Sequence, residues 1–172
     1  TKIIATPHHQ NGMFFNKKKD ILKSVKELNN VLQSENIPLE VLPGQETRIY
    51  GSLLDDFEKG DILALNHTNY LFVELPSGHV PRYTEQLLFE MQLKGVTPII
   101  VHPERNTEIM KDPEKILKLV KKGALTQLTA GSLTGHFGKR VQKFSIQLIE
   151  ANCTHFIASD VHNTSTRSFH MR

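Results

Sequence analysis

The sequence lacks the features that mark disulfide-rich, membrane-spanning or secreted proteins. Cys153 is its single cysteine, which excludes an internal disulfide framework and a zinc cluster held by thiolates. No apolar run is longer than a few residues, so no segment predicts a transmembrane helix. The first residues contain no basic stretch followed by an apolar one, and we therefore expect a cytoplasmic protein without membrane insertion.

A strong excess of one charge is also missing. The chain has 21 Lys and Arg against 18 Asp and Glu, a formal net charge of +3. The basic residues form no continuous stripe, so the sequence does not indicate a nucleic-acid partner, although it allows an anionic substrate. The 172 residues predict a single domain over 1–172.

Several catalytic motifs are absent. A cysteine-based phosphatase needs Cys-x5-Arg, but the sixth residue after Cys153 is Ser159, and we expect Cys153 to be a small buried residue. The residues around Gly138-Lys139-Arg140 lack the upstream glycine and the following Ser or Thr of a P-loop. No Gly-x-Ser-x-Gly elbow occurs. A thiol nucleophile, a P-loop and a serine elbow are therefore excluded.

Short β-rich runs alternate with longer segments of helical periodicity. The runs are apolar without clean alternation, which is typical of parallel strands buried on both faces. This order predicts an α/β fold with a parallel sheet, and does not separate a barrel from an open sheet. The predicted strands are Lys2–Thr6, Leu39–Leu42, Tyr70–Leu75, Thr97–His102, Ala124–Thr129 and His155–Ser159, and the predicted helices are Lys18–Glu35, Thr84–Lys94, Lys115–Lys122 and Gly138–Asn152.

Imidazole and carboxylate side chains stand at or just after the ends of all but one of these strands. The carboxyl ends of parallel strands open on one face, where α/β proteins place their active sites. Each residue taken singly fits an ordinary surface position, but their coincidence predicts a shared site. Glu74 is the sharpest member, because a carboxylate inside an apolar strand is costly to bury without a cation. The set is His8, His9, Glu46, Glu74, His102, Asp160 and His162.

Histidines and carboxylates without cysteine suit Mn²⁺, Fe or Zn²⁺ better than a metal that prefers sulfur ligands. The candidates outnumber the ligands of one catalytic metal, so we expect two or more ions. Such ions lower the pKa of a bound water and stabilise the oxygens of a phosphoester. Arg105 and Arg167 are the nearest guanidinium groups in the sequence and suit phosphoryl oxygens.

In their order along the chain, these motifs resemble the PHP (polymerase and histidinol phosphatase) superfamily, and more closely the bacterial manganese-dependent tyrosine-protein phosphatases of capsular and exopolysaccharide synthesis. The resemblance covers essentially all of the chain. The motifs that carry it are Thr6-Pro7-His8-His9, Gly44-Gln45-Glu46, Phe72-Val73-Glu74, His102-Pro103-Glu104-Arg105 and Ser159-Asp160-Val161-His162-Asn163.

The resemblance implies a distorted (β/α) TIM-like barrel with two or three metal ions. It implies that Glu46 bridges two metals and that Asp160 helps to hold the first. Glu74 and His102 would complete the second site, and His8 and His162 would contribute to the third. It gives Arg105 and Arg167 the role of catalytic, phosphate-binding residues. The implied substrate is phosphotyrosine on a bacterial tyrosine autokinase that regulates polysaccharide export.

The family opens with a strand carrying His-x-His, which this sequence does not contain, and it continues beyond Arg172. We therefore expect a fragment that lacks the first strand-helix unit and the C-terminal end. Two alternatives to the tyrosine phosphatase remain. One is another PHP phosphoesterase of the histidinol-phosphatase type, and the other is a catalytically silent metal-binding or kinase-docking module. The oligomeric state is not predicted.

Overall fold

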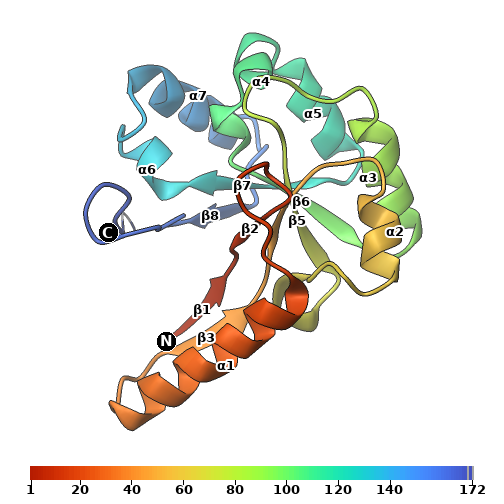
Figure 1. Ribbon diagram of the computed structural model, residues 1–172. Coiled ribbons are helices and arrows are strands. Elements are labelled where there is room, and N and C mark those ends of the chain that lie inside the picture. Colours follow the sequence, from red (N-terminus) through yellow and green to blue (C-terminus); the bar gives the residue numbers. More distant parts are fainter. Residues whose placement is uncertain (170, 172) are drawn as a thin grey trace. The chain divides into compact units, whose positions relative to one another are not determined.

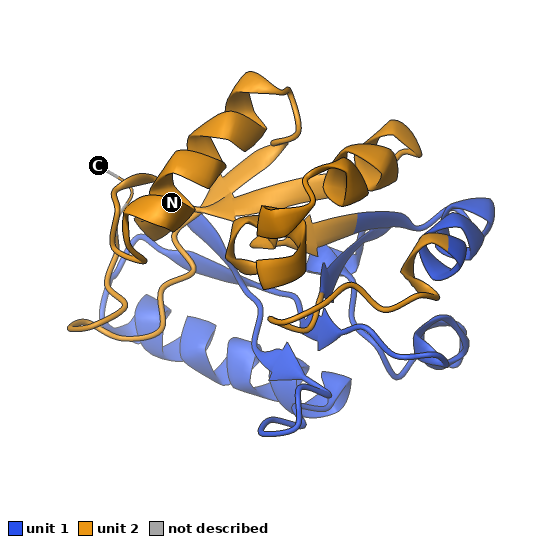
Figure 2. Cartoon of the chain, turned by 90° about the horizontal axis from the view of Figure 1, so that it is seen from above, with its two compact units in different colours: residues 1–74, 86–98 blue, residues 75–85, 99–172 orange. Residues whose placement is uncertain are grey.

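The computed structural model describes residues 1–169 and 171, which form two compact units (Figures 1 and 2). Unit 1 comprises residues 1–74 and 86–98, and unit 2 comprises residues 75–85 and 99–172. In the part of the chain that the structure describes, none of the helices has the length and apolar character needed to cross a membrane.

Parallel strands form the framework of unit 1. The strand β1 (Lys2–Ala5) pairs with β3 (Glu40–Pro43), and β2 (His8–His9), β4 (Glu46–Arg48) and β5 (Tyr70–Glu74) pair in that order. Every one of these pairings is parallel, as the alternation of apolar runs and helices predicted.

The helix α1 (Lys18–Ser34) lies along β3 (Figure 1). Its apolar side buries Ile21 and Leu32, while its other side is exposed. The Asn29 side chain ties the helix to the strand, because it donates to the carbonyl of Val41 and accepts from the amide of Val41, both at 2.8 Å. Helical periodicity therefore located α1 correctly to within one residue.

The shorter elements of unit 1 were not predicted. They include the strands β2 and β4, and also α2 (Leu53–Glu58) and the 3-10 turn η1 (Leu65–His67), which lie between β4 and β5. The predicted helix α3 (Thr84–Leu93) contributes its residues from 86 onward to this unit. Its core contains Leu53, Leu71, Val73 and Met91, all with an exposed fraction of 0%.

In unit 2 the strands follow the order β6 (Thr97–Val101, which begins in unit 1), β7 (Leu125–Thr129) and β8 (Phe156–Ala158). Again the pairing is parallel. The remaining elements are the 3-10 turn η2 (Pro103–Arg105) and the helices α4 (Thr107–Lys111), α5 (Glu114–Lys121), α6 (Ala130–Leu133) and α7 (Lys139–Glu150).

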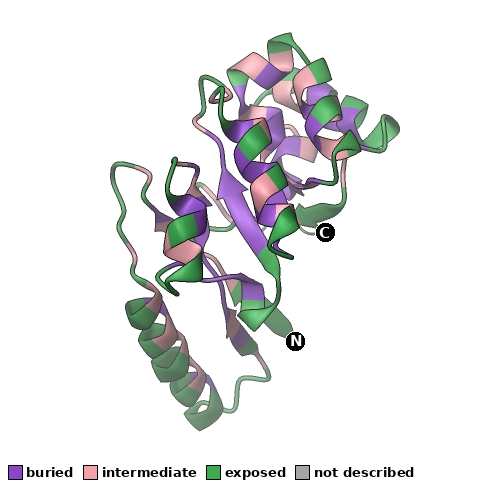
Figure 3. Cartoon of the chain, turned by 90° about the vertical axis from the view of Figure 1, so that its right-hand side faces the viewer, coloured by how far each residue is buried: buried purple, intermediate pink, exposed green. Residues whose placement is uncertain are grey.

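Burial separates the central strands from those at the edges (Figure 3). The β5 strand is buried from Leu71 to Glu74, as the apolar pattern predicted. The same prediction was wrong for β1 and β8, where Ile4 is 43% exposed and Ile157 is 45% exposed. Among the described residues β1 pairs only with β3, and β8 stands last in its strand order, so each of the two has a single neighbouring strand.

Candidate metal centre and arginine cluster

In unit 1 the pairing of the short strands brings three candidate ligands together. His8 lies in β2 opposite Glu46 in β4, and Glu74 ends β5 opposite Arg48. The sequence pattern predicts His8 and Glu46 just after strands, but both are members of strands. Those strands are two and three residues long, too short for any periodicity to mark them.

The ligand atoms of His8, Glu46 and Glu74 all lie within 4.8 Å of one another. The His8 Nδ1 atom is 3.3 Å from Glu46 Oε1 and 3.8 Å from Glu74 Oε2. Glu46 and Glu74 are 4% and 6% exposed. Two carboxylates this close and this buried favour a cation between them, since burial raises the cost of unneutralised charge. One imidazole nitrogen and two carboxylate oxygens are ligands that Mn²⁺, Fe and Zn²⁺ accept, so the residues fit a divalent metal.

Arg48 contacts this cluster and was not predicted from the sequence. The Arg48 guanidinium donates to both carboxylate oxygens of Glu74, each at 3.0 Å. Glu74 therefore has the cationic neighbour that its burial requires. Arg48 stands two residues after Glu46 in β4, so its side chain emerges on the same face of the strand as Glu46. That alternation was the available signal for Arg48.

In unit 2 two arginines converge on one carboxylate. The Nη2 atoms of Arg105 and Arg167 lie 2.8 and 2.6 Å from Asp160 Oδ2. The hydroxyl of Thr129, at the end of β7, donates to the same oxygen at 3.3 Å. The Arg105 guanidinium also lies 5.0 Å from the centre of the Phe137 ring, a cation–π distance. Guanidinium groups gathered in this way are suited to bind a phosphoryl group.

His102 and Asp160 both have positive φ, 38° and 49°, in the left-handed region that non-glycine residues seldom adopt. Such backbone strain persists where surrounding contacts hold the residue, and it clusters at functional sites. The amide of His102 donates to the carbonyl of Gln127 at 2.7 Å, which holds the end of β6 against β7. His162 Nδ1 lies 3.6 Å from Asp160 Oδ1.

Two buried polar residues beside Arg105 were not singled out from the sequence. Glu104 is 0% exposed, and its Oε1 atom accepts from the amide of Thr129 at 3.0 Å and from the hydroxyl of Ser132 at 2.6 Å. Asn106 is the N-cap of α4, accepting from the amides of Glu108 and Ile109. Together they fix η2, and with it Arg105, against β7 and α4. Their positions within a short turn offer no periodic signal.

His9 and Cys153 are both buried, and burial shifts the pKa of each side chain. Burial lowers the pKa of His9, which is 4% exposed, and favours its neutral form. The Cys153 side chain is buried as predicted, and burial raises the pKa of its thiol, which disfavours a thiolate nucleophile.

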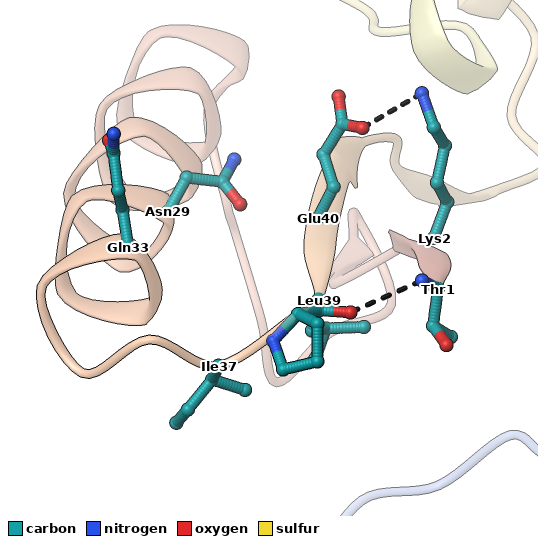
Figure 4. A pocket seen from close by; sticks show the side chains of 8 residues that line it. Thr1, Lys2, Asn29, Gln33, Ile37, Leu39 and Glu40 are labelled. Atoms are coloured by element: carbon teal, nitrogen blue, oxygen red, sulfur yellow. Dashed lines mark hydrogen bonds and ion pairs between the residues drawn. The ribbon is translucent and has the colours of Figure 1, made fainter.

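A separate hollow of about 530 Å³ lies on unit 1, between α1 and the beginnings of β1 and β3 (Figure 4). An ion pair of 2.8 Å joins Lys2 to Glu40 at its wall. None of the predicted ligands lines it. Its lining consists of Thr1, Lys2, Asn29, Gln33, Ile37, Pro38, Leu39 and Glu40.

The chain is similar to known proteins along its whole length. Residues 1–172 match the family described as "Capsular polysaccharide synthesis, CpsB/CapC". Over 168 residues it is 53% identical to the tyrosine-protein phosphatase YwqE of Bacillus subtilis, covering 98% of the chain and 66% of YwqE. It is 38% identical over 172 residues to the putative tyrosine-protein phosphatase CapC of Staphylococcus aureus, covering 100% of the chain and 68% of CapC.

A solved structure agrees with these matches. It is one of a set of crystal structures of YwqE from Bacillus subtilis and CpsB from Streptococcus pneumoniae, which are described as unique metal-dependent tyrosine phosphatases. The TM-score is 0.95 at 53% identity, covering 98% of this chain and 68% of the solved one. The chain thus spans about two thirds of the length of the relatives it matches.

Proposed function

Because the chain belongs to the CpsB/CapC family of capsular polysaccharide synthesis, we propose that it carries the site of a metal-dependent protein-tyrosine phosphatase. The observation that carries the proposal is the buried cluster of His8, Glu46 and Glu74, whose ligand atoms lie within 4.8 Å of one another. The names of the relatives, which are tyrosine-protein phosphatases, support the same reaction.

In this proposal His8, Glu46 and Glu74 hold a divalent metal. When bound, the metal supplies Lewis-acid stabilisation of the phosphoryl oxygens and lowers the pKa of water. Glu46 and Glu74 neutralise the ion, and Arg48 fixes the orientation of the Glu74 carboxylate through its two hydrogen bonds. His102, Asp160 and His162, which belong to unit 2, are proposed as further metal ligands.

Arg105 and Arg167 are proposed to bind the phosphoryl group of the substrate. In the structure both donate to Asp160 Oδ2, and a phosphoryl group would offer the same kind of charged oxygen. Such contacts stabilise charge that grows on the transferred group in the transition state. Phenolate, with a pKa of about 10, is a far better leaving group than an alkoxide, so the demand on a general acid is modest for phosphotyrosine.

More specific predictions about the fold, the metal, the substrate and the location are also part of this proposal. They are the PHP-type distorted barrel over a single domain 1–172, manganese as the metal with two or three ions, a bacterial tyrosine kinase as the phosphoprotein substrate, and a cytoplasmic location. The match of one family over 1–172 supports the single domain. The buried carboxylates and the imidazole support a hard or borderline divalent ion such as Mn²⁺.

The test compares two substrates on the metal-loaded protein. We expect kcat/KM for a phosphotyrosine peptide to exceed that for histidinol phosphate. Glu46→Gln should lower kcat/KM for the peptide by about 100-fold, because it removes a charged ligand from the cluster. The matched control is Glu27→Gln on the exposed side of α1, which should leave the rate unchanged.

Each result decides between the three functions. Cleavage of histidinol phosphate without cleavage of the peptide favours the small-molecule phosphoesterase. If the protein contains no Mn, Fe or Zn by elemental analysis and cleaves neither compound, the phosphatase proposal is contradicted and the kinase-docking module remains.

A further inference from the structure

The loop that follows β2 exposes three large apolar side chains in succession. Met13 is 85% exposed, Phe14 50% and Phe15 58%. Exposed apolar residues scattered singly are ordinary, but a run of three is a small apolar patch that calls for a ligand or partner. Its position is informative, because the loop begins immediately after His8 and His9.

The loop has a defined conformation. The Asn11 Oδ1 atom accepts from the amides of Met13 and Phe14 at 3.1 and 2.8 Å, which closes a turn at its tip. At its far end the Asn16 side chain donates to the carbonyl of His8 at 2.8 Å, and the buried Gln45 side chain donates to the carbonyl of Asn16 at 2.7 Å. The near end of the loop continues directly from β2, and its far end is bonded to His8 and to Gln45, the residue before β4.

The two phenylalanines have different neighbours. The Phe15 ring lies 4.7 Å from the ring of the buried His9, and the Lys17 ammonium lies 5.7 Å from its centre. The Phe14 ring is 6.1 Å from the His8 ring, and the two planes differ by 19°. Phe14 therefore stands almost parallel to a side chain of the metal cluster while half of its surface stays exposed.

From this geometry we infer that Phe14, with Met13 beside it, forms the seat for the phenyl ring of phosphotyrosine. The inference rests on the proposed function, since it uses the cluster of His8, Glu46 and Glu74 as the place of the phosphate. In an aryl phosphate a single oxygen separates phosphorus from the ring. A phosphate near His8 therefore puts the ring beside the next aromatic side chain, which is Phe14.

Such a seat predicts a preference for aryl over alkyl phosphates. A phenyl ring gains offset stacking with Phe14 and burial against Met13, whereas the methylene of phosphoserine has no flat face to stack. The contact is made in the bound complex as well as in the transition state. Its loss should therefore raise KM more than it lowers kcat.

The test measures binding and turnover on the metal-loaded protein. Calorimetry with phenylphosphonate and methylphosphonate, neither of which has an ester bond to hydrolyse, gives the preference for the ring. We expect Phe14→Ala to lower the ratio of these affinities about fivefold, a size typical of one aromatic contact. It should raise KM for a phosphotyrosine peptide by a similar factor with little change in kcat, and Phe14→Tyr should restore the wild-type values.

The matched control is Phe89→Ala, which removes an equally exposed phenylalanine, 51% exposed, from α3. Unchanged thermal unfolding of Phe14→Ala confirms that the variant is folded. Wild-type protein that binds phenylphosphonate no better than methylphosphonate overturns the inference, as does an unchanged ratio in Phe14→Ala. Failure of the wild type to cleave the peptide overturns the proposed function instead, and the phosphonate ratio still decides on the seat.

Discussion

At the scale of single residues, arginine–carboxylate pairs hold the polar groups of both units. Arg48 makes two hydrogen bonds to Glu74 in unit 1, and Arg105 and Arg167 share Asp160 in unit 2. A guanidinium suits this task because its planar fork stays charged at every pH that a folded protein meets. Each guanidinium thereby places positive charge beside a carboxylate that has little contact with solvent.

The Glu74–Arg48 pair predicts an unequal effect of mutation on the two forms of the protein. Arg48→Met should destabilise the metal-free protein by about 2 kcal/mol, because it leaves a buried carboxylate without its donor. The loss should be smaller with Mn²⁺ present, since the ion neutralises the same group. Urea unfolding with and without the metal measures both values. Arg82→Met, at an exposed position, is the control, and equal losses in the two conditions would contradict the role of Glu74 as a ligand.

At the scale of elements, side chains in and beside short turns hold neighbouring segments in place. Asn106 is the single residue between the η2 turn and α4. It caps α4 and donates to the carbonyls of Pro76 and His79 at 2.7 and 3.0 Å. Glu108 in the first turn of α4 adds a second link to the same segment, since it accepts from the amide of Val80 at 2.7 Å. The segment 75–85 is therefore fastened to α4 by side chains.

The hydrogen bond from Val80 to Glu108 should make the stability of unit 2 depend on pH in the acidic range. The amide of Val80 and the ammonium of Lys115 hold the pKa of Glu108 below its ordinary value of 4.5. The folded state then binds the proton less readily than the unfolded chain, so the stabilisation is present above pH 4.5 and is lost as pH falls through the lower folded pKa. Glu108→Gln should unfold at lower urea than wild type at pH 7, and the difference should shrink at pH 3. Glu114→Gln on α5 is the control, and a difference independent of pH would contradict this explanation.

At the scale of the whole molecule, the proposed metal ligands of unit 1 come from strands that are far apart in the sequence. His8, Glu46 and Glu74 meet because β2, β4 and β5 pair with one another. An unfolded chain does not hold these three groups together. A metal that binds them therefore binds the folded state preferentially and stabilises it.

Metal should accordingly raise the unfolding temperature of the whole chain. At a Mn²⁺ concentration about 100 times the Kd, the stabilisation is about 2.7 kcal/mol, which corresponds to roughly 5–10 °C for a protein of this size. A chelator should reverse the shift. Differential scanning calorimetry on wild type, Glu46→Gln and the control Glu27→Gln checks this, and a shift that Glu46→Gln retains in full would show that the metal binds elsewhere.

Local patterns predicted much of the fold. The helical periodicity from Lys18 and the glycines at positions 95 and 123, with φ of 76° and 94°, marked where α1 begins and where α3 and α5 end. The missed elements are those without a pattern, such as β2 and β4, whose two or three residues acquire strand geometry from their neighbours. The burial of Glu74 was predicted, but its partner Arg48 was not. Alternation along β4 places Arg48 on the same face as Glu46, but only the pairing of β4 with β5 brings it to Glu74, 26 positions away.

The sequence by itself determined the alternation of strands and helices and the residue types that occur at or near the strand ends, because both depend on neighbours along the chain. Tertiary structure decided that His8, Glu46 and Glu74 form one cluster, that Asp160 receives two arginines, and that Phe14 stands beside His8. These contacts depend on strand register and side-chain packing. A register changed by one residue would move every side chain of a strand to the opposite face.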